Sequence, residues 1–280
     1  MTDRYAVVGN PIAHSKSPII HAEFARRTGE PMVYERLLAP LDGFAATVAR
    51  FAAEGGKGLN VTVPFKVEAF AMATACTERA RLAKAVNTLK RVGDHWHADN
   101  TDGAGLVHDL IENLGVTLTG RRVAVLGAGG AAHGILKPIL DAKPAEVVVA
   151  NRTPASAAAL VQDFGRHGPV TAVAPRDLGG RTFDVVINAT SFGMREGDPG
   201  PAPCPGSIFA PGSFAYDLVY PQTDVPTPFV AFARASGAVR AADGLGMLIE
   251  QAAESFFIWR GVRPDTSSMF TLLRGHPRVD

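Results

Sequence analysis

A lysine and an aspartate stand next to polar strand ends in the first part of the chain. The segment NVTVPFK ends in Lys66, and its Asn60 and Thr62 alternate, so both point to one face of an expected strand. Asp102 lies in the segment NTDG, just before an expected helix. A desolvated lysine can exchange protons with a substrate, and a nearby carboxylate can orient its ammonium group. We therefore interpret Lys66 and Asp102 as a candidate acid/base pair, although a solvated lysine and a helix-capping aspartate are commoner.

Two serines earlier in the chain could bind a small carboxylate. Ser15 and Ser17, in the segment SKS, stand at an expected helix start, where free N–H groups and partial positive charge attract anions. Ser17 is also a good N-cap, with Pro18 in the first helical position, and capping alone would explain it. Asn87, in the segment AVNT, lies in a further polar stretch that precedes Asp102.

A glycine-rich turn at residues 127–132, GAGGAA, lies between an expected strand and an expected helix. Gly127 permits a tight turn, Gly129 lets the backbone approach a pyrophosphate, and Ala132 lets the helix pack closely on the strand. The helix start supplies N–H groups and partial positive charge for phosphates. This context predicts a dinucleotide site, and the alternative is a glycine-rich turn without a ligand.

The next expected strand ends in NRT, residues 151–153, which decides the cofactor. NAD-binding proteins carry an acidic residue there for the ribose 2′-hydroxyl, whereas a basic residue accommodates a 2′-phosphate. Arg152 could contact the phosphate, and Asn151 and Thr153 offer hydrogen bonds. The segment therefore favours NADP, against the alternative that Arg152 is a solvated surface residue.

Alternating strands and helices must position these residues. We expect an α/β protein with right-handed βαβ units and parallel sheets, plus one hairpin around Gly93-Asp94. The loop-like stretch 195–212, with prolines at 199, 201, 203, 205 and 211, is interpreted as a surface excursion. The expected strands are 5–8, 32–38, 58–63, 86–92, 96–98, 122–126, 146–150, 184–188, 214–219 and 239–241, and the expected helices are 18–28, 42–54, 66–73, 103–114, 129–140, 154–164, 226–236 and 246–261.

Length and composition exclude several classes of protein. The 280 residues suggest about two domains, and 46% hydrophobic against 20% charged residues is ordinary globular composition. A net charge of +1 gives no general footprint for nucleic acid or an anionic membrane. Only Cys76 and Cys204 are present, so we expect a reduced, cytoplasmic setting. We see no signal peptide and no apolar run long enough to span a membrane.

Eight motifs in order give the sequence a recognisable pattern: SxS, NVTVPFK, AVNT, NTDG, GAGGAA, NRT, NATSFGM and GLGMLIEQA. Together they resemble the shikimate dehydrogenase family over residues 5–261. The resemblance implies a two-domain α/β fold, with an N-terminal catalytic domain (1–104 and 243–280), a Rossmann-type NADP-binding domain (105–242), and a C-terminal helix that returns to the first domain. It implies a site in the cleft between the domains and a reversible, NADPH-dependent reduction of 3-dehydroshikimate to shikimate, a step towards chorismate and the aromatic amino acids.

The resemblance also implies roles for individual residues. Lys66 would be the catalytic acid/base beside Asp102, and Ser15 and Ser17 would hold the substrate carboxylate. The remaining substrate contacts would be Asn60, Thr62, Asn87, Tyr220 and Gln251. The cofactor would contact Gly127, Ala128, Gly129, Gly130, Ala131, Asn151, Arg152, Thr153, Thr190, Ser191, Met194, Gly244 and Met247. We expect a small-molecule substrate, a monomer or homodimer, and no resident metal, because His95 and His97 lack a third ligand.

The chain departs from the family pattern at Ser156, where members that prefer NADP often carry a second basic residue. Quinate/shikimate and aminoshikimate dehydrogenases of the same family remain alternatives. Ser17, where threonine would favour quinate, and Arg152 speak against an NAD-dependent quinate enzyme. A non-catalytic NADP-binding regulator is a further alternative, which the presence of both Lys66 and Asp102 disfavours. Methylene-tetrahydrofolate dehydrogenases share the two-domain plan but fit the two serines and NTDG less well.

Overall fold

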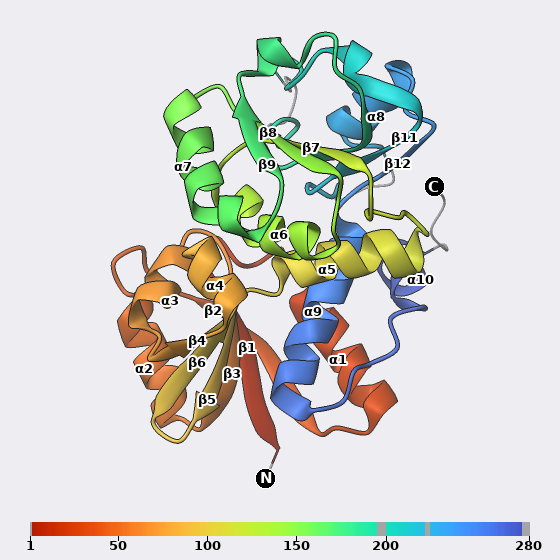
Figure 1. The fold of residues 1–280 in the computed structure, drawn as a ribbon. Coiled ribbons are helices and arrows are strands. Elements are labelled where there is room, and N and C mark those ends of the chain that lie inside the picture. Colours follow the sequence, from red (N-terminus) through yellow and green to blue (C-terminus); the bar gives the residue numbers. More distant parts are fainter. Residues whose placement is uncertain (1, 195–199, 222–224, 276–280) are drawn as a thin grey trace. The chain divides into compact units, whose positions relative to one another are not determined.

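The computed structural model describes residues 2–194, 200–221 and 225–275 (Figure 1). The chain divides into two compact units, Met1–Gly105 with Ile249–Met269, and Leu106–Leu248 with Phe270–Asp280. Each unit is built on one six-stranded sheet. Among the described residues, no helix combines the length and the apolar character that a membrane crossing requires.

The sheet of the first unit is mixed, with strand order β2-β1-β3-β5-β6-β4. Its centre is parallel, because β1 pairs with both β2 and β3 in that sense, whereas β5 and β6 form the expected antiparallel hairpin. The strands are β1 (Asp3–Gly9), β2 (Met32–Leu38), β3 (Gly56–Val61), β4 (Ala75–Cys76), β5 (Thr88–Val92) and β6 (His95–Asp99).

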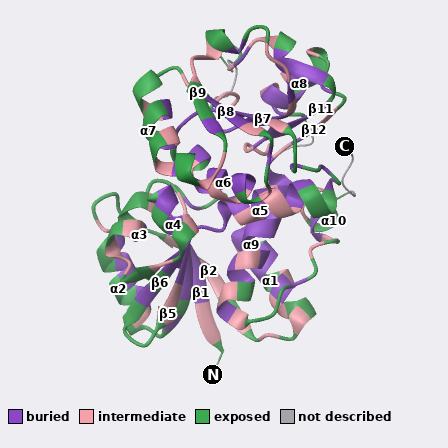
Figure 2. Ribbon diagram, viewed as in Figure 1, coloured by how far each residue is buried: buried purple, intermediate pink, exposed green. Residues whose placement is uncertain are grey.

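The two faces of this sheet differ in chemistry. Helices α2 (Phe44–Ala53), α3 (Lys66–Met72) and α4 (Glu78–Ala83) cover one face, and their apolar side chains form a buried cluster with Leu59 and Val61 (Figures 1 and 2). Helices α1 (Ser17–Thr28) and α9 (Leu245–Arg260) cover the other face (Figure 1). Because side chains alternate along a strand, Asn60 points away from the apolar cluster that contains its two neighbours.

The sheet of the second unit is entirely parallel, with strand order β12-β11-β10-β7-β8-β9. The order reverses between β7 and β10, and such a switch point is where parallel α/β sheets bind nucleotides. The strands are β7 (Arg122–Leu126), β8 (Glu146–Ala150), β9 (Val170–Val173), β10 (Phe183–Asn188), β11 (Phe209–Asp217) and β12 (Arg240–Ala242), and the helices are α6 (Gly130–Asp141), α7 (Pro154–Phe164) and α8 (Pro228–Ala235).

Six further helical segments lie among the described residues. Helix α5 (Asp102–His108) continues as a π-helix, η1 (Asp109–Asn113), where the sequence predicts one uninterrupted helix. Buried Asp109 accepts a hydrogen bond from Tyr216 within this π-helical turn. The other segments are three short 3₁₀ turns, η2 (Gly165–His167), η3 (Pro175–Leu178) and η4 (Gly206–Ile208), and helix α10 (Met269–Arg274).

The start of α1 differs from the expected one. Ser17 is the first helical residue and Lys16 is the N-cap, with no side-chain cap, so the assignment of Ser17 as N-cap and Pro18 as first helical residue is wrong by one position. Lys16 already has helical backbone angles (φ −84°, ψ −8°).

The proline-rich stretch is not the surface excursion that the sequence suggested, as far as it is described; residues 195–199 lie outside the described part. Cys204, Ile208 and Phe209 are buried in an apolar cluster of the second unit. Strand β11 begins within the stretch, and its register shifts around Pro211 and Gly212. A strand tolerates proline at such an irregularity, so the proline count concealed a buried strand.

Candidate active site

Lys66 and Asp102 lie side by side in the first unit. The Lys66 Nζ donates to Asp102 Oδ2 at 2.5 Å, and Asn87 Nδ2 donates to Asp102 Oδ1 at 2.7 Å. Lys66 begins α3 just after β3, and Asp102 begins α5 just after β6, so the backbone delivers both side chains from adjoining element ends. The Lys66 side chain is 31% exposed and that of Asp102 12%, so a small molecule can reach the ammonium group while the carboxylate stays sheltered.

Asn87 connects this pair to helix α9. Its Nδ2 also lies 2.9 Å from Thr101 Oγ1 and 3.2 Å from Gln251 Oε1, and its Oδ1 accepts from the Thr101 backbone N–H at 2.8 Å. Helices α5 and α9 pack closely here, because a Cβ placed on Gly105 would lie 2.5 Å from the Gln251 nitrogen. The glycine therefore lets Gln251 reach the residues that hold Asp102.

Asn60 is buried on the same side of the sheet, and all its polar atoms are used. Its Oδ1 accepts from the Tyr34 hydroxyl at 2.7 Å and faces His21 Nε2 at 3.2 Å. Its Nδ2 donates to Ser255 Oγ at 3.0 Å and to the Asn87 carbonyl at 3.1 Å. Burial lowers the pKa of His21 to about 3, so the ring is neutral and must carry its hydrogen on Nε2 to serve Asn60.

The two serines lie at the start of α1. Ser15 Oγ accepts from the Ser17 backbone N–H at 3.3 Å, and Arg36 donates to the Ser15 carbonyl. Ser17 itself is buried, whereas Ser15 is partly exposed. Thr62 follows β3, half-buried, with its backbone N–H on the Val8 carbonyl.

The glycine-rich turn of the second unit lies at the end of β7, next to β10. Gly127 has a φ of +104°, and a Cβ there would lie 2.9 Å from the Ala189 carbonyl oxygen. Gly129 is the N-cap of α6 without a side-chain cap, and neither it nor Gly130 has an atom near the position of a Cβ. The first N–H groups of α6, around Ala128 and Ala131, are therefore open to a phosphate.

The residues after β8 are open to solvent. Arg152 and Thr153 are exposed, and Asn151 Nδ2 donates to the Thr153 carbonyl at 3.0 Å. An exposed guanidinium beside the glycine-rich turn suits a ribose 2′-phosphate, which offers oxygens for paired N–H donors. The residues of the second unit thus fit NADP.

A buried aspartate holds the ends of β10 and β11 together. Asp217 accepts from Asn188 Nδ2 at 2.8 Å, from the Thr227 hydroxyl at 2.6 Å and from the Val219 backbone N–H at 3.1 Å. Asn188 in turn accepts from the Thr190 hydroxyl at 2.6 Å. Burial raises the pKa of Asp217 to about 6, and the three donors oppose that shift.

The other expected cofactor residues surround these strand ends. Ser191 and Met194 are exposed, Tyr220 is half-buried, and Gly244 leaves no room for a side chain because a Cβ would lie 2.3 Å from the Leu218 carbonyl. The Met247 backbone N–H donates to the Tyr216 hydroxyl at 3.0 Å, which anchors the start of α9.

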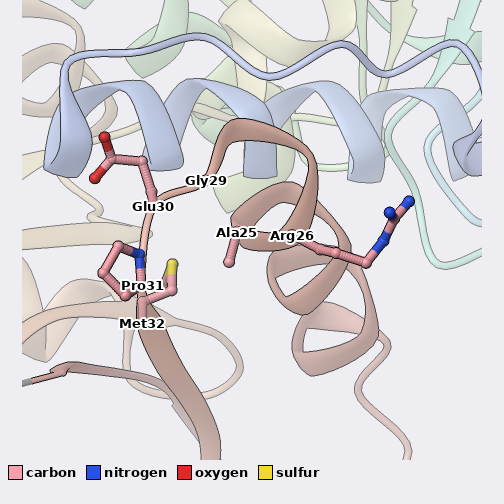
Figure 3. Close-up of a pocket in the computed structure, with 6 residues that line it drawn as sticks. All are labelled: Ala25, Arg26, Gly29, Glu30, Pro31 and Met32. Atoms are coloured by element: carbon pink, nitrogen blue, oxygen red, sulfur yellow. The ribbon is translucent and has the colours of Figure 1, made fainter.

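A separate hollow of about 370 Å³ lies where α1 ends and β2 begins (Figure 3). It is lined by Ala25, Arg26, Gly29, Glu30, Pro31 and Met32. Its charged side chains are already paired, Arg26 with Glu23 and Glu30 with Arg260. None of the expected site residues lines it.

Comparison with known proteins places the chain among its relatives. It is 54% identical to the NADP(+) shikimate dehydrogenase of Nitrosospira multiformis, over 98% of both chains. It is 55% identical to the enzyme of the same name from Alkalilimnicola ehrlichii, over 98% of this chain and 99% of the other. The chain belongs to the shikimate dehydrogenase family.

Family models match three stretches of the chain. The shikimate dehydrogenase substrate binding domain matches residues 7–89, the shikimate / quinate 5-dehydrogenase model residues 109–193, and the shikimate 5′-dehydrogenase C-terminal domain residues 244–269.

Two solved structures are similar over nearly the whole chain. An Ael1 enzyme from Pseudomonas putida is 46% identical with a TM-score of 0.91 and 98% coverage of both chains. The Thermus thermophilus shikimate 5-dehydrogenase in complex with NADP(H) and shikimate is 34% identical with a TM-score of 0.84, over 96% of this chain and 97% of that one.

Sequence reasoning missed the side chains that hold the family's motif residues in place. These are His21, Tyr34, Thr88, Thr101, Ser255 and Asp217. A weak signal was present in the polar residues that stand among apolar neighbours on strands, and in Ser255, which follows Gln251 by one helical turn. Their partners lie far away in sequence, so spacing alone could not have identified them.

Proposed function

We propose that this chain catalyses the reversible, NADPH-dependent reduction of 3-dehydroshikimate to shikimate. Membership of the family supports the reaction class. The observation that carries the proposal is the partly exposed Lys66–Asp102 ion pair at 2.5 Å, in which Asn87 holds the carboxylate. A ketone that accepts a hydride needs a proton donor at its oxygen, and the Lys66 ammonium group can be that donor.

The substrate is proposed to bind through its carboxylate and its hydroxyls. Ser15 and Ser17 hold the carboxylate at the start of α1, where hydroxyl and backbone N–H donors converge. Asn87, Asp102, Thr62, Gln251 and Tyr220 bind the ring hydroxyls. Asn60 contributes by holding the end of β3 in place, because its own amide atoms are saturated within the chain.

Proton transfer is proposed to run through Lys66. As the carbonyl carbon gains a hydride, the carbonyl oxygen takes a proton from the Lys66 ammonium group and becomes a hydroxyl. The neutral amine then regains its proton from solvent through its exposed side. Asp102 keeps the ammonium group in position and stabilises its charge, and in the oxidative direction the same pair accepts the proton.

NADP supplies the hydride chemistry when it is bound. The glycine-rich turn and the start of α6 are proposed to hold the pyrophosphate, and Arg152 with Asn151 and Thr153 the 2′-phosphate. Thr190, Ser191, Met194, Gly244 and Met247 are proposed to line the nicotinamide side. Gly127 fits this role because only a glycine satisfies both its positive φ and its approach to Ala189.

The domain roles, location and assembly form part of the same proposal. Residues 1–104 and 243–280 serve as the catalytic domain and residues 105–242 as the NADP-binding domain. The enzyme is a monomer or homodimer and works in the cytoplasm. A reducing cytoplasm fits the two free cysteines, Cys76 and Cys204, of which Cys204 is buried with its pKa raised to about 12. Light scattering and cell fractionation test these points.

One assay panel tests the function directly. Oxidation rates are measured for shikimate and quinate, each with NADP and with NAD. We expect the highest kcat/KM for shikimate with NADP. Brisk quinate oxidation with negligible shikimate oxidation would replace the proposal with a quinate dehydrogenase, and the absence of all four activities would favour a regulator.

A further inference from the structure

An ion pair outside the family's motifs holds the strand end that leads to Asp102. Arg79, the second residue of α4, donates through Nε to Asp99 Oδ1 at 2.6 Å and through Nη2 to Asp99 Oδ2 at 2.7 Å. The Asp99 side chain is 9% exposed and that of Arg79 22%, so water and salt screen this pair weakly. A paired contact between a guanidinium group and a carboxylate fixes direction as well as distance.

Asp99 is the last residue of β6, and it holds the residues that lead to Asp102. Its Oδ1 accepts from the Asn100 backbone N–H at 2.7 Å, and its carbonyl oxygen accepts from the Asn87 backbone N–H at 3.1 Å. The Asn100 side chain accepts from the Asp102 backbone N–H at 3.1 Å, and Asn87 donates to the Asp102 carboxylate at 2.7 Å. Two short series of hydrogen bonds therefore connect Asp99 to Asp102.

The same guanidinium group also reaches helix α9. Its Nη2 donates to Glu254 Oε1 at 2.9 Å, and Glu254 follows Gln251 by three residues on that helix. Gln251 Oε1 accepts from Asn87 at 3.2 Å, so α9 also contacts a residue that holds Asp102. Arg79 thus joins the strand end that leads to Asp102 to the helix that carries Gln251.

We propose that Arg79 is a positioning residue for the acid/base pair, because its guanidinium group fixes the strand end before Asp102 against α9. Without that group, Asp99 is a sheltered carboxylate that has lost its ion-pair partner, and such a charge is destabilising unless it moves towards water. Its movement would shift the residues that hold the Asp102 carboxylate beside Lys66. This inference rests on the proposed function, because it takes Lys66 and Asp102 as the reacting pair.

Arg79→Gln tests the proposal, and the same helix offers a matched control. Arg81 is exposed and donates to the Cys76 carbonyl at 3.2 Å. Arg81→Gln therefore removes an equal charge from α4 and leaves the Arg79–Asp99 pair in place. Arg79→Lys is a milder variant, because lysine keeps the positive charge but cannot make the paired contact.

A second control separates positioning from stability. Arg263 donates to Glu254 Oε2 at 2.9 Å and to Oε2 of the buried Glu250 at 2.8 Å. Arg263→Gln leaves a buried carboxylate without this partner, so it should lower the free energy of unfolding. Because the Arg79–Asp99 pair remains, kcat should stay within about twofold of the parent.

We expect Arg79→Gln to lower kcat for shikimate oxidation about tenfold, since a small misplacement of a catalytic group is costly. Arg79→Lys should lower kcat about threefold, because its charge restores part of the contact. Arg81→Gln should stay within about twofold, and no variant should change the KM for NADP. The fluorescence of Trp96 and Trp259, both in the first unit, shows whether each variant is folded during the assay.

Two outcomes of these assays would overturn the proposal. One is an unchanged kcat in folded Arg79→Gln, or in Arg79→Lys if the glutamine variant does not fold. The other is an equal fall of kcat in Arg263→Gln and Arg79→Gln, which would show that the loss follows stability.

A double-mutant cycle tests whether Arg79 acts through Asp102. In an Asp102→Asn background, adding Arg79→Gln should change kcat less than about twofold, because the carboxylate that Arg79 positions is already gone. Losses that multiply would overturn the inference, while shikimate oxidation by the unsubstituted chain upholds the proposed function. Failure of the unsubstituted chain to oxidise shikimate would overturn both.

Discussion

In the proposed mechanism Lys66 exchanges a proton while Asp102 holds its ammonium group, and Asp102 is held in turn by Asn87. At the scale of single residues, these hydrogen bonds distinguish the residue proposed to react from the residues that hold it in position. In the proposed mechanism Lys66 meets the reacting oxygen and Asp102 keeps its ammonium group in position. Asn87 holds Asp102 and also bonds Thr101 and Gln251. Substitutions along this series should therefore affect catalysis before they affect stability.

Replacing Lys66 by alanine should lower kcat several hundredfold or more while NADP still binds, because general acid catalysis contributes roughly 10²–10⁴-fold. The measurements are steady-state rates and a fluorescence titration with NADPH. Lys57→Ala, an exposed lysine in the same unit, serves as the control and should keep full activity. Equal rates in the Lys66 variant and the parent would remove Lys66 from the mechanism.

Arg152 is proposed to bind the 2′-phosphate of NADP, without the second basic residue that Ser156 replaces. Arg152→Ala should raise the KM for NADP on the order of 10–100-fold, the value of a charge-assisted hydrogen bond, and leave the KM for NAD nearly unchanged. Arg166→Ala, another exposed arginine of the second unit, should alter neither value. A parallel rise for both cofactors would show that Arg152 does not read the phosphate.

At the scale of elements, close packing of α5 on α9 positions the polar groups of the first unit. Gly105 makes this approach possible, and Ser255 continues it one turn further along α9, where its Oγ bonds Thr88 and Asn60. The face under α2, α3 and α4 is apolar, whereas the face under α1 and α9 combines buried apolar side chains, such as Phe24 and Phe256, with the hydrogen bonds of Asn60 and Thr88. The geometry of the site is thus a property of one face of one sheet.

Gly105→Ala should separate the two helices. The added methyl group would lie 2.5 Å from the Gln251 nitrogen, and such overpacking costs about 1–3 kcal/mol. Urea unfolding should show that loss, together with a fall in kcat/KM for shikimate. Gly165→Ala places a methyl group in open space at a helical φ of −57° and should change neither quantity. If both variants behave alike, the approach at Gly105 does not matter for the site.

At the scale of the whole molecule, the two units contain buried groups that titrate in opposite senses. His21, in the first unit, has its pKa lowered to about 3 by burial, so its contribution to stability is complete above pH 6.5 and is lost as the pH falls towards 3. Asp217, in the second unit, has its pKa raised to about 6, so its contribution is present below pH 3.8 and is lost as the pH rises through 6. Mild acid should therefore destabilise the first unit through His21, and it should lower the free-energy cost of burying the Asp217 carboxylate in the second unit.

Tryptophan fluorescence can follow the first unit alone, because Trp96 and Trp259, the two tryptophans of the chain, both belong to it. Between pH 7.5 and pH 5 its free energy of unfolding should fall by about 2 kcal/mol through His21. His21→Gln should flatten this dependence, whereas His95→Gln, at an exposed position, should leave it unchanged. An equally steep dependence in the His21 variant would contradict the assignment.

The sequence predicted the fold where local signals were strong. Strands β2, β7 and β8 and helix α7 begin and end at the expected residues, because glycine, proline or a polar turn bounds each of them. It missed β4, α4, β9 and α10, whose few residues are too short for a clear period. The proline-rich stretch misled for a different reason, since a register shift lets β11 accommodate Pro211.

The candidate site was only partly visible in the sequence. Ordered motifs pointed to Lys66 and Asp102, which the fold brings together across 36 positions. The supporting contacts also join residues far apart in the sequence, with 26 positions between Tyr34 and Asn60 and 195 between Asn60 and Ser255. Such pairs arise from the order of strands in the sheet and from helix packing, so no local sequence pattern predicts them.

The first unit is built from two segments of the chain that are synthesised at different times. Its segment Ile249–Met269 leaves the ribosome after the whole stretch Leu106–Leu248. Until then Asn60 and Thr88 lack their hydrogen-bond partner Ser255, and Asn87 lacks its partner Gln251. The sheet face that α9 covers is exposed for the same time. Domains generally fold as units during translation, the N-terminal one first. Here the N-terminal unit is complete only after α9, near the C-terminal end of the chain, has been synthesised. Chaperones that shield nascent chains should therefore engage residues 1–105 for most of translation.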